Sequence, residues 1–469
     1  MDPSSSKWRV AVIGSGPSAF YTAEALFKSP AATTPDAGSG VQVDMFDRLP
    51  VPFGLVRGGV APDHQKIKSV VRVYDKIAAQ PGFRFFGNVK LGRDLQVEDL
   101  ARCYHQIVYA FGCESDNRLG APGEDLAGVY SATEFVGWYN GHPDHRHRSF
   151  DLQNSRRVAL IGNGNVAMDV ARVLLQSPDR LAPTDIADYA LAALRDSNVE
   201  EVILLGRRGP AQAAFSPKEI EEIGELDGVD VVVRPEEAEL DEISRAWLEG
   251  AGARSQQRNA KYIAACAELG EGSSKHKLRC RFLVSPTEIL GDDGRVRAVR
   301  VEHMQLQLDD SGTPRPRSKG TTEDVECDLV FKAIGYRGEP VPGVPFDERK
   351  GIVPNRDGRV LGAPGGEVVR GQYVAGWCKR GPTGLIGTNS PDAKATVELM
   401  LEDRAAAAML EPAAADIAPW LAEQGIDAVS WADWQRLDAW EQTEGEKRGK
   451  LRHKLSSIDE MMTVIRELR

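Results

Sequence analysis

The sequence predicts an α/β fold made of two Rossmann-like domains, with the second domain inserted into a discontinuous first domain. A glycine-rich turn with G-x-G-x-x-A spacing follows a short apolar run at residues 14–19 and again at residues 162–167. Two other apolar runs end in glycine, at Gly112 and Gly335, where we expect the chain to leave and re-enter the first domain. The expected domains are residues 1–113 together with 336–469, and residues 114–335 between them.

Composition limits the class of protein before any motif is considered. The 469 residues are 42% hydrophobic and 27% charged, an ordinary globular balance for two or three domains. A formal net charge of −11 argues against a nucleic-acid partner. No apolar run reaches the ~18–20 residues that span a bilayer. The six cysteines form no C-x-x-C pair, so we expect no metal or cluster site, buried reduced thiols and a cytoplasmic location.

The first unit reads as strand, helix and strand in succession. Residues 9–13 are an apolar run typical of a strand that is buried on both faces. Apolar side chains at helical spacing predict a helix over 18–28, and residues 41–46 form the second strand. A polar, turn-rich connection over 31–40 lies between them.

The first glycine turn has the chemistry of a dinucleotide site. Gly14 permits the tight turn, Gly16 lets the backbone approach a pyrophosphate, and Ala19 lets the helix pack closely on the sheet. Asp47 ends the second strand, where a carboxylate can accept both ribose hydroxyls of an adenosine. The same charge repels a 2′-phosphate, so this unit is predicted to bind FAD or NAD rather than NADP.

The second unit repeats the pattern but ends differently. A strand over 157–161 leads into Gly162 and Gly164, and a helix over 166–176 and a strand over 201–205 follow. The second strand of this unit is followed by Arg207 and Arg208, and guanidinium groups suit phosphate oxygens.

The difference between the two units assigns the cofactors. The Asp47 unit is predicted to take FAD, and the Arg207/Arg208 unit is predicted to take NADP(H) through its 2′-phosphate. Two dinucleotides in one chain indicate hydride transfer between them. Alternatives are an NADPH-dependent flavin monooxygenase, a diaphorase that acts on small acceptors, or, outside the enzymes, an FAD/NADP-binding redox sensor.

Several other segments carry expectations of their own. Residues 51–57 have too many Gly and Pro for regular structure and suit a loop along a flat ring. In residues 374–389, Gly384 opens a helix whose amides can face a flavin. Polar loops are expected at 270–274 and 309–320. A helix over 393–409, including the Ala run 405–408, and a helical tail with packed tryptophans complete the chain.

These segments resemble those of ferredoxin–NADP(+) reductases of the adrenodoxin reductase type. The resemblance implies that NADPH reduces FAD, which then passes single electrons to a ferredoxin-type iron–sulfur protein. The similarity covers about residues 9–389, with a looser tail. The segments that carry it are residues 12–20, 52–64, 162–172, 206–215 and 376–389.

The resemblance also implies roles for individual residues. The residues implied to hold FAD are Ser18, Asp47, Leu55, Val89, Trp377, Gly384, Leu385 and Ile386. The residues implied to hold NADP(H) are Asn165, Val166, Ala167, Met168, Arg207, Arg208, Glu219 and, near the nicotinamide, Gly384. His64 and Glu222 are placed near the flavin, where a proton-handling role competes with a purely structural one.

The sequence offers several charged segments as docking sites for the iron–sulfur protein and does not choose among them. The basic run 447–454 can attract an acidic partner or can simply be a solvated helix end. Rival docking charges are Lys66, Lys68 and Arg72, or Lys379 and Arg380. The histidines at 142, 145 and 147 are expected to lie on a solvated loop rather than to bind a metal.

Overall fold

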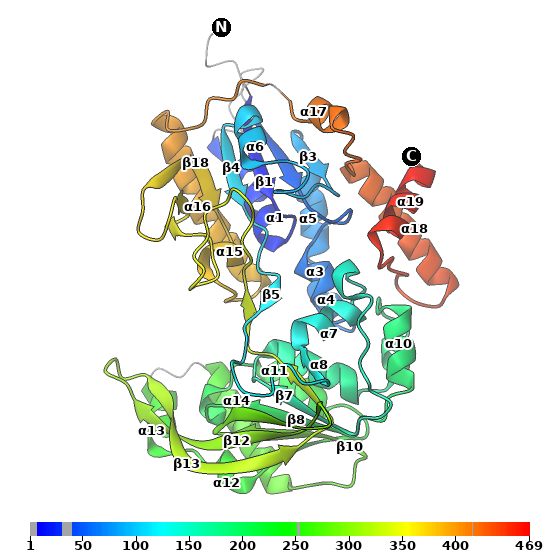
Figure 1. Ribbon diagram of the computed structural model, residues 1–469, viewed down its shortest axis with the longest axis vertical. Coiled ribbons are helices and arrows are strands. Elements are labelled where there is room, and N and C mark those ends of the chain that lie inside the picture. Colours follow the sequence, from blue (N-terminus) through cyan, green and yellow to red (C-terminus); the bar gives the residue numbers. More distant parts are fainter. Residues whose placement is uncertain (1–6, 31–39, 251–253, 415) are drawn as a thin grey trace.

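A computed structural model describes residues 7–30, 40–250, 254–414 and 416–469 (Figure 1). Two sheets lie one above the other along the long axis, each with its own helices. We call these parts the seven-stranded half and the six-stranded half. The predicted α/β class is therefore confirmed. The predicted connection over 31–40 falls almost wholly outside the described residues.

The seven-stranded half contains the first predicted βαβ unit. Its strand order is β16-β17-β18-β4-β1-β2-β3, and the pairs from β18 to β3 are parallel. Val10, Val12 and Val108 are fully buried, as expected for strands covered on both faces. The strands are β1 (Trp8–Ile13), β2 (Val41–Phe46), β3 (Phe83–Phe86), β4 (Gln106–Tyr109), β16 (Asn355–Arg356), β17 (Arg359–Leu361) and β18 (Val368–Val374).

Helices from both ends of the chain cover this sheet. Trp434, Leu437 and Met461 of the C-terminal helices share a core cluster with Val10 and Phe20, so the expected packing of the tail is confirmed. The helices are α1 (Pro17–Phe27), α3 (Leu55–Gly58), α4 (Gln65–Lys68), α5 (Val71–Ala78), α6 (Val97–Cys103), α15 (Trp377–Arg380), η4 (Ile386–Thr388), α16 (Asn389–Ala405), α17 (Ala418–Glu423), α18 (Trp431–Lys447) and α19 (Ile458–Leu468).

The six-stranded half contains the second predicted βαβ unit. Its strand order is β6-β14-β7-β8-β10-β9, with every pair parallel. The strands are β6 (Val129–Ser131), β7 (Arg157–Ile161), β8 (Glu201–Gly206), β9 (Val229–Val233), β10 (His276–Phe282) and β14 (Leu329–Lys332). A three-stranded antiparallel sheet adjoins it, formed by β11 (Val284–Asp292), β12 (Arg295–Leu308) and β13 (Pro314–Glu326).

The helices of this half include the one that follows the second glycine turn. They are α7 (Ala132–Tyr139), η2 (Pro143–His145), α8 (Asn165–Leu175), α9 (Pro178–Leu181), α10 (Asp188–Arg195), η3 (Pro210–Gln212), α11 (Pro217–Gly224), α12 (Pro235–Ala238), α13 (Glu242–Gly250) and α14 (Arg254–Leu269).

The chain crosses between the halves twice, and the two crossings lie side by side. They pair as a short antiparallel ribbon of β5 (Ser115–Asp116) and β15 (Tyr336–Arg337). Gly112 and Gly335 precede these strands with φ of 78° and 97°, a conformation that favours glycine. The glycines that mark the expected domain boundaries thus stand at the entry to this ribbon.

Three local expectations are wrong. Residues 314–320 of the expected polar loop belong to β13, because the turn is confined to residues 309–313, where Asp309 accepts backbone bonds at its tip. Helix α16 ends at Ala405 despite the Ala run, since Ala407 has φ 53° and Leu410 N bonds to His105 O at 2.9 Å. The segment 51–57, expected to be irregular, leads into the helical turn α3.

Two further features can be compared with the sequence. All six cysteines are buried and free, as expected. Across the described parts of the chain, no helix has both the length and the apolar character that crossing a membrane requires.

Candidate functional site

The first glycine turn has the geometry that its sequence predicts. Gly14 has φ 108°, and a Cβ added there would lie 2.5 Å from the carbonyl oxygen of Ala110. Gly16 precedes α1, and a Cβ added to it would meet nothing within 4 Å. Gly14 is therefore required by the fold, whereas the face of Gly16 is open to a ligand. Ala19 is fully buried against the sheet.

Asp47 lies beside this turn at the end of β2. Its Oδ2 accepts hydrogen bonds from Ser15 N at 3.0 Å and Ser15 Oγ at 2.5 Å, and its Oδ1 accepts from Leu49 N at 2.9 Å. Burial raises the pKa of the Asp47 carboxyl, and the Ser15 and Leu49 hydrogen bonds oppose that rise. Buried Val89 donates its N–H to Asp47 O at 2.8 Å. The carboxylate is thus held in one orientation against the glycine turn.

The segment before α3 also packs on this turn. Phe53 N donates to Ser15 O at 2.9 Å, and Phe53 has the unusual φ of 86°. A Cβ added to Gly54 would lie 3.1 Å from Gly16 Cα. Leu55, at the start of α3, is therefore brought next to the first glycine turn.

The segment 374–389 reaches the same region from the other side. A Cβ added to Gly376 would lie 2.5 Å from the side chain of buried Ser18. Trp377 begins α15 and donates Nε1–H to Thr383 O at 3.2 Å. Gly384 has φ 81°, and Leu385 leaves 68% of its surface exposed just before η4 and α16. Ile386 begins η4, so the expected helix start after Gly384 is confirmed.

The second glycine turn has nearly the same geometry as the first. Gly162 has φ 121°, and a Cβ added there would lie 2.3 Å from Ala333 O. A Cβ added to Gly164 would meet nothing within 4 Å. Asn165 begins α8, and its Oδ1 accepts a bond from Ser216 N at 2.8 Å. The other residues that the resemblance places here lie in the first turn of α8 and are mostly buried: Val166, Ala167 and Met168.

Arg207 and Arg208 follow β8 and are exposed. The described residues offer neither guanidinium an ion-pair partner. Partial burial and the like charges of Arg207 and Arg315 lower the pKa of Arg208. The two arginines therefore leave positive charge uncompensated beside the second glycine turn, where an anion would be stabilised.

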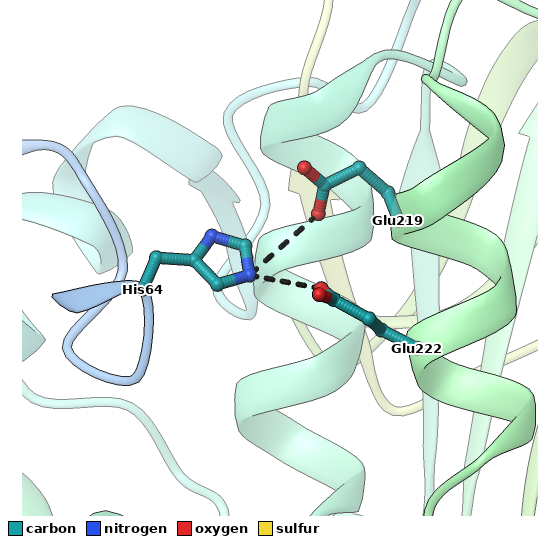
Figure 2. A group of neighbouring side chains, drawn as sticks. All are labelled: His64, Glu219 and Glu222. Carbon is teal, nitrogen blue, oxygen red and sulfur yellow. Dashed lines mark hydrogen bonds and ion pairs between the residues drawn. The ribbon is translucent and has the colours of Figure 1, made fainter. Parts of the chain in front are cut away.

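A charged cluster joins the two halves of the molecule (Figure 2). His64 precedes α4 in the seven-stranded half, and its Nε2 lies 3.1 Å from Glu222 Oε2 and 4.0 Å from Glu219 Oε2, both on α11. Glu219 was expected to lie near NADP(H), and His64 and Glu222 near the flavin. The structure brings all three together.

The cluster contains residues that sequence reasoning missed. Arg172 on α8 pairs with Asp63 at 2.8 Å, Asp169 at 2.7 Å and Glu219 at 3.2 Å. Burial opposes ionisation of Asp63, but the Arg172 guanidinium lowers its pKa to about 2. Burial and the charge of Asp169 raise the pKa of Glu219. The i, i+3 spacing of Asp169 and Arg172 was the available signal.

A polar cavity of about 460 Å³ adjoins this cluster. It is lined by Asp63, His64, Arg172, Gln176, Arg180, Thr184, Glu222, Glu225 and Leu226. The His64, Glu219 and Glu222 ligand atoms lie within 4.8 Å of one another, close enough to share a cation. Arg172 and Lys218 already pair with the two carboxylates, so the cluster is better described as an ion-pair network.

Two expectations about the charged surface need correction. Of the rival docking residues, Lys68, Lys450 and Lys454 are buried in ion pairs, so they cannot contact a partner protein. His142 and His145 are half-buried with ring centroids 5.4 Å apart, not fully solvated.

Comparison with known proteins gives relatives along nearly the whole chain. NADPH-ferredoxin reductase FprA of Mycobacterium tuberculosis is 45% identical over 462 residues, covering 97% of this chain and 98% of the relative. The mitochondrial NADPH:adrenodoxin oxidoreductase of Bos taurus is 40% identical over 473 residues, covering 97% and 92%. No family model matches the chain.

A solved structure agrees with the sequence comparison. The structure of Mycobacterium tuberculosis FprA in complex with NADPH superposes with a TM-score of 0.90 at 43% identity. The match covers 98% of this chain and 99% of the other. The chain therefore belongs to the family of NADPH-ferredoxin and NADPH:adrenodoxin reductases.

Proposed function

We propose that the protein is an FAD-dependent reductase that takes a hydride from NADPH and delivers single electrons to a ferredoxin-type iron–sulfur protein. The observation that carries the proposal is that two glycine turns of similar geometry are flanked by side chains of opposite charge. A carboxylate, Asp47, stands at the first turn, and two guanidiniums without an ion-pair partner among the described residues, Arg207 and Arg208, stand at the second. Bound flavin would supply the step from a two-electron donor to a one-electron acceptor.

The residues around the first turn fit FAD. The open face of Gly16 leaves room for a pyrophosphate at the N-terminus of α1. Nε and Nη1 of Arg380 are buried donors without a partner among the described residues, which suits a polar ligand in the segment 374–389. We assign FAD to Gly14, Gly16, Ser18, Ala19, Asp47, Leu55, Val89, Trp377, Gly384, Leu385 and Ile386.

The residues around the second turn fit NADP(H). The open face of Gly164 serves the pyrophosphate, and Arg207 and Arg208 serve the 2′-phosphate. Buried Glu219 lies within the network that joins the halves. We assign NADP(H) to Gly162, Gly164, Asn165, Val166, Ala167, Met168, Arg207, Arg208 and Glu219, with Gly384 shared between the two ligands.

His64 and Glu222 are assigned a proton-handling role rather than an essential one. Their hydrogen bond of 3.1 Å lets a proton pass between imidazole and carboxylate. The polar cavity beside them gives that pair a route to solvent. Hydride transfer itself requires neither group.

The proposal includes the domain division and the setting of the enzyme. Residues 1–113 with 336–469 form the FAD-binding domain, and 114–335 form the NADP-binding domain. The iron–sulfur partner docks through cationic side chains that remain exposed, such as Lys66, Arg72 and Lys447. Six free, buried thiols are compatible with a cytoplasmic protein.

Three measurements on one preparation test the proposal. The visible spectrum of the purified protein should show flavin, and NADPH should bleach it without air. NADPH-dependent reduction of cytochrome c should accelerate when a ferredoxin is added. A rate that no ferredoxin raises would refute the electron-transfer role and favour a diaphorase.

A further inference from the structure

In a six-residue stretch of the seven-stranded half, Asp63 to Lys68, three residues pair with charged residues of the six-stranded half. Asp63 pairs with Arg172 at 2.8 Å, and His64 pairs with Glu222 at 3.1 Å. At the other end of α4, Lys68 Nζ lies 2.7 Å from Asp185 Oδ2. Helix α4, which follows His64, is therefore held to the six-stranded half at both of its ends.

Of the contacts at the two ends of α4, those to Asp185 are the more completely buried. Asp185 precedes α10; the side chains of Asp185 and Lys68 are 8% and 9% exposed, whereas those of Asp63 and Glu222 at the other end are 19% and 27% exposed. Gln65 Nε2 of α4 donates to Asp185 Oδ1 at 3.0 Å. A buried carboxylate with several charge-assisted partners holds them in a narrow range of positions.

The C-terminal segment supplies a second lysine to the same carboxylate. Lys454 Nζ lies 2.9 Å from Asp185 Oδ2, and its side chain is 2% exposed. The same ammonium donates at 3.1 Å to Arg57 O in the seven-stranded half and at 3.1 Å to Asn140 O in the six-stranded half. The buried Nζ of Lys454 thus bridges the backbones of both halves.

We propose that Asp185, with Lys68 and Lys454, is an anchor that sets the orientation of the two halves, and that these three are positioning residues for hydride transfer. The inference rests on the proposed function, in which the donor and acceptor sites lie in different halves. Hydride transfer needs near-contact geometry, and a misplacement of about 1 Å can cost about 100-fold in rate. None of the three needs to touch either ligand.

The charges of the anchor indicate which substitutions to make. Two lysines share one carboxylate, so Lys68→Met or Lys454→Met each leaves a balanced Lys–Asp pair. Asp185→Asn would leave two buried lysine side chains without a carboxylate partner and can fail to fold. The control is Arg359→Met, which breaks a 2.8 Å ion pair to Asp403 inside the seven-stranded half. Asp403 keeps a hydrogen bond from Tyr373 at 2.7 Å.

The test measures geometry and rate separately on the FAD-loaded protein. Spin labels go on Gln80→Cys and Leu269→Cys, one exposed site in each half, because all six native cysteines are buried. Pulsed EPR then gives the distribution of distances between the halves. Stopped-flow bleaching by NADPH gives the limiting rate and the apparent Kd, and thermal unfolding gives the loss of stability.

We expect broadened or shifted distances in both lysine variants, a limiting rate about tenfold lower or more, and an apparent Kd within about twofold. Arg359→Met should lose stability yet keep the wild-type distances and rate. Wild-type distances in both lysine variants, or an equal fall in rate in Arg359→Met, would overturn the inference. Failure of NADPH to bleach the wild-type flavin would instead refute the proposed function, and the distances would still test the anchor.

Discussion

Replacement of Arg207 and Arg208 by alanine is the most direct test of the cofactor assignment. Both guanidiniums are exposed, and no described residue neutralises them. Partial burial and the neighbouring positive charges of Arg207 and Arg315 lower the pKa of Arg208, so bound phosphate would relieve a repulsion already present. We therefore expect Arg207→Ala, Arg208→Ala and the double variant to weaken the binding of NADPH far more than the binding of NADH.

The magnitude follows from the exposure of the two side chains. A hydrogen bond to a charged group is worth about 1.5–3 kcal/mol, and solvent exposure favours the lower end. About 1.5 kcal/mol corresponds to about a tenfold rise in KM for each single variant. The double variant should reach about 100-fold if the two contacts add. NADH has no 2′-phosphate, so its KM should change by less than about twofold.

The assay is steady-state reduction of ferricyanide with each nicotinamide cofactor, repeated with Arg315→Ala. Arg315 contributes positive charge to the same region but pairs with Asp309 at 2.9 Å, so its removal should have the smaller effect. Equal rises in KM for NADPH and NADH would refute the reasoning. A larger effect of Arg315→Ala than of either single variant would move the phosphate site to the β12–β13 hairpin.

Three further predictions concern the glycine turn, acid stability and the His–Glu pair. Gly14→Ala should unfold at lower temperature even without FAD, because the added Cβ would clash with a carbonyl oxygen. Gly16→Ala should keep its stability and lose affinity for FAD. Thermal melts and flavin titration distinguish the two variants. The pKa of Asp63 is about 2, so its ionised form contributes about 2 kcal/mol of stability above pH ~4–5 that is lost as the pH falls toward 2. Asp63→Asn should remove that loss, and denaturant unfolding at pH 6 and pH 3 checks it; identical pH dependence in variant and wild type would contradict it. Glu222→Gln should slow flavin bleaching by less than about tenfold and alter its pH profile, because proton handling assists but does not drive the step; abolished bleaching would show that the carboxylate is essential.

Much of the fold could be predicted because local signals and tertiary packing agree. The first unit shows this, since β1, α1 and β2 match their predicted ranges to within a residue or two. Each is a buried strand or helix whose apolar spacing is set by the sheet that covers it. The long strand β13 was missed because its exposed, charged sequence has no apolar alternation, and only pairing with β12 makes it a strand.

The candidate site divides in the same way. The two glycine turns and their terminal Asp47 and Arg207 are local motifs, so spacing alone identifies them. The contacts that join the two halves at Arg172 and at Asp185 link residues more than 100 positions apart, as Asp63 with Arg172 and Lys68 with Asp185. The spacing of residues in the sequence does not indicate contacts of this kind. For the same reason the lysines at 450 and 454 looked like surface charge in the sequence but are buried in the structure.

The paired crossings β5 and β15 have a consequence for engineering. Tyr336 lies opposite Asp116 and Arg337 opposite Ser115, so the ends of the intervening segment meet at one place. A module whose entrance and exit coincide can be excised from a gene and the gap closed with a short turn, or exchanged for that of a relative with a different coenzyme preference. Such a chimaera would need to keep only the β5–β15 ribbon and the ion pairs between the inserted segment and the seven-stranded half.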